Sequence, residues 1–121
     1  MSTLNRWEPR VLYTFLIAKR DRAHNLIEQR LVDRALVRLF ESLRKALGGV
    51  TKMRPFEAVG STSEWGREPT TVVLVLAKVA EEETADNSVA TQGASLTQTL
   101  AQDEVWIAKQ TLHLHIARYT G

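Results

Sequence analysis

The chain has 121 residues, of which 44% are hydrophobic and 25% are charged, and its formal net charge is +2. It contains no cysteine, which excludes disulfides, thiolate nucleophiles, iron–sulfur clusters and cysteine-built zinc sites. Its length is typical of one domain, so we expect residues 1–121 to form a single domain. No stretch reaches the roughly 18–20 apolar residues of a membrane span, and the N-terminus has no signal-peptide pattern. We therefore expect a soluble cytoplasmic protein with no membrane partner.

The first two elements should be a strand and a long helix. Residues 11–18 are rich in β-branched and aromatic side chains and predict a strand that is apolar on both faces. Residues 26–47 carry apolar side chains at intervals of three and four, which predicts an amphipathic helix that packs on a sheet. Asn25 is the expected N-cap and Glu28 its capping-box-like partner, and the glycine pair that starts at Gly48 should end the helix.

A pair of strands should follow the helix. Residues 50–59 alternate between apolar and polar side chains, and Pro55 places this strand at an edge or a bulge because proline lacks an amide hydrogen. Residues 70–77 are apolar on both faces and should form the most buried strand. Between them, residues 60–69 are rich in turn-forming side chains and contain Trp65.

The C-terminal third predicts a loop, a short helix and a strand. Residues 81–88 carry a run of carboxylates and are expected to form an acidic loop. Residues 94–102 predict a short helix with Leu96 and Leu100 on its inner face. Residues 111–119 alternate well and predict the last strand.

The order strand, helix, strand, strand, helix, strand is typical of an α+β, ferredoxin-like two-layer sandwich. Right-handed crossovers place both helices on one face of a four-stranded antiparallel sheet. The usual spatial order is last, first, third, second, so residues 11–18 and 70–77 become the central strands. These are the two segments that are apolar on both faces, so the pattern and the topology agree.

Two helices on one face leave the other face of the central strands uncovered. That face would expose alternate side chains from the set Leu12, Tyr13, Phe15, Leu16, Val72, Val73, Leu74 and Val75. Such a patch is larger than monomers usually tolerate, and leaving about 400 Å2 of it in water forgoes on the order of 10 kcal/mol of burial. We therefore expect a homodimer through the sheet face. The alternative is that the N-terminal segment or the acidic loop folds over it.

The middle of the chain resembles small ferredoxin-like proteins of uncharacterised function. The motifs that carry the resemblance lie within residues 48–77: Gly49-Val50-Thr51, Ala58-Val59-Gly60, Trp65 and Glu68–Val73. The resemblance implies the fold and suggests dimerisation, but it implies no reaction. An origin as a mobile gene-cassette protein is a further hypothesis.

His113 and His115 are the sharpest candidates for chemistry, because residues two apart on a strand project from one face. Two histidines are one ligand short of an ordinary catalytic zinc site, and the spacing of His24 or Glu57 does not complete a set. The sequence therefore predicts no metal and no cofactor. The pair suits ligand anchoring or general-base chemistry, and exposed strand histidines are the ordinary alternative.

Arg30, Arg34 and Arg38 recur every four residues and form a basic ridge on the predicted first helix. A phosphate backbone would suit such a ridge. However, Asp33 and Glu41 lie within a turn of it, and no stacking aromatic side chain interleaves with the arginines. A solvated helix face is therefore the ordinary interpretation, and nucleic acid is not the expected partner.

The sequence leaves the function open, including whether the protein is an enzyme. Phosphate-loop, dinucleotide-binding, zinc-protease and nucleophile-elbow motifs are absent from it. The first hypothesis is a dimeric module that binds a small, partly apolar ligand or a protein partner in a cleft at the open sheet face, with anchors His113, His115, Tyr119 and Trp65. The second is a cofactor-independent enzyme of the dimeric α+β barrel kind with His113 or His115 as general base. The third is nucleic-acid binding through the arginine ridge.

Overall fold

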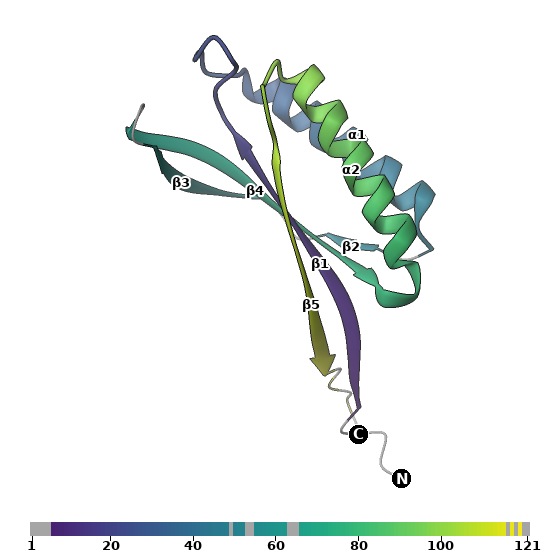
Figure 1. Ribbon diagram of the computed structural model, residues 1–121. Helices are drawn as coiled ribbons and strands as arrows, with labels where there is room; N and C mark the ends of the chain where they lie inside the picture. The colour runs from purple at the N-terminus through teal and green to yellow at the C-terminus, as the bar shows by residue number, and fades with distance from the viewer. Residues whose placement is uncertain are drawn as a thin grey trace.

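Two helices lie together on one face of a twisted antiparallel sheet in the computed structural model (Figure 1). The structure describes residues 6–48, 50–52, 55–62, 66–115, 117 and 119. Its elements follow in the order β1 (Trp7–Ala18), α1 (Gln29–Ala46), β2 (Val50–Lys52), β3 (Phe56–Thr62), β4 (Gly66–Lys78), the 3-10 turn η1 (Val79–Glu81), α2 (Glu82–Thr99) and β5 (Trp106–His115). No helix among the described residues has the length and apolarity needed to cross a membrane.

The sheet has four strand positions, one of which is shared by two short strands. The order is β2-β4-β1-β5, and β3 also pairs with β4. Val50 of β2 lies opposite Ala77, whereas Phe56 of β3 lies opposite Val72, so β2 and β3 occupy successive parts of one edge. Pro55 lies between them, at the edge that its missing amide hydrogen predicts. The predicted spatial order, and with it the α+β ferredoxin-like fold class, is confirmed.

The core lies between the helices and one face of the sheet. The sheet contributes alternate residues of the two central strands, namely Val11, Tyr13, Phe15 and Ile17 of β1 with Val73, Val75 and Ala77 of β4. α1 contributes the stripe that its sequence period predicts, Val32, Ala35, Leu36, Leu39 and Leu43. α2 contributes Ala85, Val89, Gly93 and Leu96. Burial of these apolar side chains supplies most of the favourable free energy of folding.

α1 begins at Gln29, later than the sequence predicts, and the expected cap at Asn25 is wrong. The reason is a local turn that the sequence reading did not include. The Oδ1 atom of Asp21 accepts the backbone amide of Asn25 at 2.9 Å, so Asn25 belongs to an aspartate-held turn. The backbone amide of Ile27 then donates to the Lys19 carbonyl at 2.7 Å, which keeps the chain from entering the helix earlier.

α2 is the largest departure from the predicted elements. The predicted acidic loop at residues 81–88 is wrong, because the helix starts at Glu82 and runs to Thr99. The acidic side chains of Glu82 and Glu83 form its first turn, where negative charge is favourable at the positive end of the helix dipole. The inward stripe of α2 consists largely of small side chains, so its helical period is weak in the sequence.

Gln102 joins the turn after α2 to the end of β1. Its side-chain amide donates to the carbonyl oxygens of Ala18 and Arg20, and the backbone amide of Arg22 donates to the Ala101 carbonyl at 2.8 Å. The residues that lead into α1 therefore contact the C-terminal end of α2. At the other end, the amide of Gly48 donates to Glu81, so the two helices run antiparallel.

The bounds of β1 and β5 differ from the prediction because β5 pairs along its whole length with residues 7–16 of β1. β5 spans Trp106–His115 in place of residues 111–119, and β1 begins at Trp7 in place of Val11. Leu16 lies opposite Trp106 at one end of the ladder and Trp7 lies opposite His115 at the other. The paired ends around Trp7 and His115 extend beyond the helices as a two-stranded arm (Figure 1).

Candidate functional site

The candidate binding surface is the face of the sheet that points away from the helices, which we call the open face. Its central part comes from side chains of β1 and β4 that alternate with the core residues. The register joins them in three cross-strand pairs, Leu12 with Leu76, Thr14 with Leu74 and Leu16 with Val72. No helix or strand of the described residues lies over these pairs (Figure 1).

β5 extends each of these pairs by one residue. Trp106 continues the row of Leu16, Ala108 the row of Thr14, and Gln110 the row of Leu12. The side chain of Trp106 is 64% exposed. Exposure of such a large aromatic ring to water is unfavourable, and contact with a ligand or a partner would bury the ring and lower the free energy. Among the side chains that the structure describes, the open face is therefore a mostly apolar surface with a few polar groups and the exposed ring of Trp106.

The register also decides which residues of the predicted apolar set lie outside the core. Leu12, Leu16, Leu74 and Val72 point to the open face, where the leucines are half-buried and Val72 is only 6% exposed. Tyr13 and the residues in step with it are buried under the helices. The sequence could not choose between the two sets, because a shift of one residue exchanges the faces of a strand.

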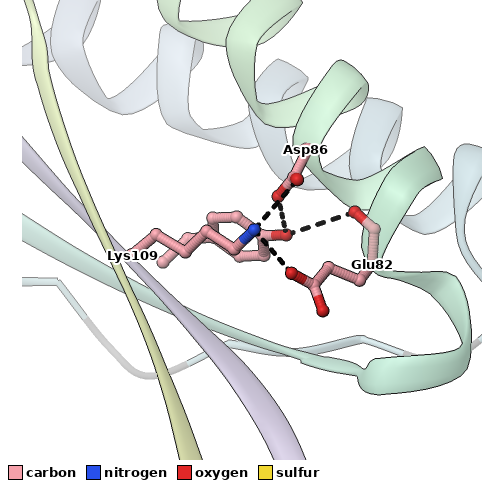
Figure 2. Close-up of polar contacts among 4 residues, drawn as sticks. Glu82, Asp86 and Lys109 are labelled. Atoms are coloured by element: carbon pink, nitrogen blue, oxygen red, sulfur yellow. Dashed lines mark hydrogen bonds and ion pairs between the residues drawn. The ribbon is translucent and has the colours of Figure 1, made fainter.

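A polar cluster connects three elements on the helix side of the sheet. The Tyr13 hydroxyl donates to Asp86 Oδ1 at 2.6 Å. Lys109 Nζ of β5 lies 2.9 Å from Asp86 Oδ2 and 2.6 Å from Glu82 Oε2, both of them on α2 (Figure 2). Tyr13 is only 2% exposed, whereas Lys109 is partly exposed. The cluster therefore links the sheet to the first two turns of α2.

The environment of the cluster stabilises the ordinary charge state of each group. Burial, together with the hydrogen bond to Asp86, raises the pKa of Tyr13 well above its usual range. The hydrogen bonds from Tyr13 and Lys109 lower the pKa of Asp86, and the bonds to Glu82 and Asp86 raise the pKa of Lys109. A neutral phenol, an ionised carboxylate and a charged ammonium group suit a structural brace better than proton transfer.

His113 and His115 lie away from the open face. His113 is opposite Pro9 and His115 is opposite Trp7, which places both imidazoles on the helix side of the sheet, in the arm beyond the helices. The rings of Trp7 and His115 are in contact, with centroids 5.1 Å apart. The expectation that these histidines line a cleft at the open face is therefore wrong, because their strand parity directs them to the other side. A role in ligand anchoring stays a prediction.

The other expected anchors do not join the histidines in one site. Tyr119 is 94% exposed and follows the end of β5. Trp65 lies outside the residues that the structure describes. Within the described part of the chain, no group of three or more histidine, cysteine, aspartate or glutamate side chains could hold a metal ion.

Sequence reasoning missed the cluster of Tyr13, Asp86 and Lys109 because it treated residues 81–88 as a solvated loop. One signal was present in the sequence. Ala85, Val89, Gly93, Leu96 and Leu100 recur at intervals of four and three, which continues a helical stripe back to the acidic run. With that helix in place, Asp86 falls one residue after a buried position and close to the sheet.

Neither a family model nor a curated protein matches the chain. Solved structures match it nearly end to end. A phage SAM lyase in complex with S-methyl-5′-thioadenosine has a TM-score of 0.54 at 14% identity, covering 98% of this chain and 99% of that one. A PII-like signaling protein from Thermus thermophilus has a TM-score of 0.48 at 16% identity, covering 89% and 91%.

A de novo designed protein with a ferredoxin fold has a TM-score of 0.43 at 12% identity, covering 93% of this chain and 92% of the design. At identities this low, likeness concerns the fold and does not extend to activity. The strand order of the sheet confirms the resemblance to small ferredoxin-like proteins as a resemblance of fold.

Proposed function

We propose that the protein is a small-molecule-binding module assembled from copies of this chain, with the open face at the contact between copies. The observation that carries the proposal is the set of rows on that face, in which Leu12, Leu16, Leu74 and Leu76 lie together without cover from the described elements. Apolar walls with a few polar groups are the usual composition of small-molecule sites.

The size of the open face limits the contact that a second copy could make through it. Four strand positions at about 4.8 Å and the seven residues from Arg10 to Leu16 make a surface of roughly 20 Å by 20 Å, or about 400 Å2. This is about half of the roughly 800 Å2 per partner of a standard interface, so a dimer through this face alone would have a small interface. A two-fold axis would place the apolar patch of each copy against the same patch of the other copy, which would cover both patches at once. The expected homodimer through the sheet face therefore stays part of the proposal.

The ligand we propose has an aromatic ring and an apolar portion. Trp106 offers an exposed ring for stacking at one end of the open face, and Gln110 and Thr14 offer an amide and a hydroxyl group in the neighbouring rows. A purine nucleoside that carries a thioether has this composition. The likeness of fold to a structure solved with S-methyl-5′-thioadenosine makes that compound the first probe.

Assembly is tested by light scattering during size-exclusion chromatography. We expect the wild-type chain to elute with the mass of an oligomer and Leu74→Lys, a charge placed in the central row, to elute as a folded monomer. Val37→Lys is the matched control, because Val37 is exposed on the outer side of α1. A monomeric wild-type protein, or an assembly that tolerates Leu74→Lys, would refute the role of the open face.

Ligand binding is tested by calorimetric titration with S-methyl-5′-thioadenosine and with S-adenosylmethionine. Trp106→Ala should lose binding, whereas Trp7→Ala should keep it, because Trp7 is similarly exposed but lies in the arm on the other side of the sheet. Equal effects of the two substitutions, or the absence of binding by the wild-type chain, would contradict a nucleoside site on the open face.

An enzyme acting on S-adenosylmethionine is the second candidate. The observation that favours it is the match to the phage SAM lyase over nearly the whole of both chains. Release of S-methyl-5′-thioadenosine during incubation with S-adenosylmethionine would support it. His113→Ala and His115→Ala then test the general-base role, which requires loss of turnover in a chain that stays folded.

A further inference from the structure

We propose that the outer face of α1 binds the phosphate backbone of a nucleic acid. The side chains of Arg30, Arg34 and Arg38 are all exposed there. Four residues advance the helix by about 6 Å, which is close to the spacing of successive phosphates along a strand. Guanidinium groups also present paired donors that match phosphate oxygens. This surface lies on the helix layer and is independent of the open face of the sheet.

Among the described residues, the nearest carboxylates, Asp33 and Glu41, form no ion pair with the arginines of the ridge. Asp33 Oδ1 accepts a hydrogen bond from the neutral amide of Gln29 at 2.9 Å and keeps its negative charge. The ion pairs in the described part of the chain involve other basic side chains. Three arginines are therefore available to an anion.

The charges of the two helices are separated along the layer. α1 carries five basic and two acidic residues, whereas α2 carries three acidic residues, all in its first five positions, and no basic one. Because the helices run antiparallel, those carboxylates lie toward the end of α1 that leads to Gly48. The ridge accordingly lies toward the second half of α2, residues 87–99, which has no charged side chain. A polyanion could follow the ridge without meeting the carboxylates of α2.

A nucleic acid fits this face better than an anionic membrane does. A helix that lies on a membrane inserts its apolar stripe between the lipids, but the stripe of α1 is buried in the core at residues such as Val32, Leu39 and Leu43. The outer face also has no aromatic side chain that could stack on an unpaired base. Contacts to phosphates alone predict binding without sequence preference.

The test is fluorescence anisotropy of labelled DNA of about 20 base pairs at several salt concentrations. Three phosphate contacts predict a slope of about −2.7 for the logarithm of the binding constant against that of the salt concentration. Arg34→Gln combined with Arg38→Gln should reduce this slope to about −0.9. The matched control is Arg6→Gln combined with Arg44→Gln, which removes the same charge outside the ridge and should keep most of the slope.

Three results would overturn the inference. These are no binding at low salt, equal losses in both double variants, and binding to anionic lipid vesicles with none to DNA. Failure of nucleic-acid binding can be told apart from failure of the proposed function, because Leu74→Lys changes the open face and leaves the ridge intact. If Leu74→Lys abolishes assembly while DNA binding per chain persists, the two surfaces are separate.

Discussion

The hydroxyl of Tyr13 donates a 2.6 Å hydrogen bond to Asp86 Oδ1, which ties a central strand of the sheet to the second helix. Asp86 also accepts from Lys109 of the neighbouring strand at 2.9 Å. Strands β1 and β5 are thereby joined to one carboxylate on α2. Nearly a hundred residues separate Tyr13 from Lys109, so the cluster forms only when the whole chain has folded.

Replacement of Tyr13 by phenylalanine should destabilise the protein by about 1–2 kcal/mol. The ring still fills the core, but the hydrogen bond to an ionised carboxylate is lost. Urea unfolding followed by circular dichroism measures the effect. Tyr119→Phe is the control, because that hydroxyl is at the exposed C-terminal end. Stability equal to the wild type in Tyr13→Phe would show that the bond contributes nothing.

The protein should lose stability at alkaline pH through Tyr13. Burial raises the pKa of Tyr13 in the folded state above its usual value near 10. The stabilising contribution is therefore complete below about pH 10 and is lost as the pH rises toward the folded-state pKa. In Tyr119→Phe, which leaves Tyr13 as the only tyrosine, phenolate absorbance should rise only together with unfolding. Ionisation of the folded protein at pH 10 would contradict this assignment.

Asp86 should contribute to loss of stability in acid. Hydrogen bonds from Tyr13 and Lys109 lower its pKa in the folded state below the ordinary value of 3.8. The contribution of Asp86 to folding stability is present above the ordinary pKa of 3.8 and is lost as the pH falls through the lowered pKa of the folded state. Between about pH 5 and pH 2 the wild-type protein should therefore lose more stability than Asp86→Asn. The same decline in both proteins would remove Asp86 as the cause.

Gly93 should couple energetically to Ile107. A Cβ atom added at Gly93 would lie 2.6 Å from Ile107 Cδ1, so α2 packs on β5 at a distance that only glycine allows without movement. Gly93→Ala should therefore fail to deliver the gain of about 1 kcal/mol that alanine offers in a helix. In an Ile107→Val background, which removes that methyl group, the gain should appear. A double-mutant cycle with no coupling would contradict this packing.

The amino-acid pattern was sufficient for elements built from large apolar side chains. Leu36, Leu39 and Leu43 mark the inner stripe of α1, and the two strands that are apolar on both faces occupy the centre of the sheet as predicted. α2 was only partly predictable, because Ala85 and Gly93 carry little hydrophobic signal although both are buried. A hydrophobic period in the sequence reveals helices that pack through large side chains more clearly than helices that pack closely through small residues.

The candidate site was less predictable than the fold, since it depends on strand register. The alternation of His113 and His115 is readable from the sequence, but the side of the sheet that they face follows from their pairing with Pro9 and Trp7. Likewise, nothing local indicates that Lys109 would meet Asp86. Contacts between distant segments are set by the tertiary fold, which a single sequence does not specify directly.

The interruption between β2 and β3 has a consequence for how sheets of this protein can join. The outer side of β4 carries two short strands with Pro55 between them, so an incoming chain finds no unbroken ladder of amides there. The outer side of β5 is a continuous ladder of ten residues. Growth of a fibril from edge to edge needs two continuous edges on each copy, and this sheet offers one continuous and one interrupted edge.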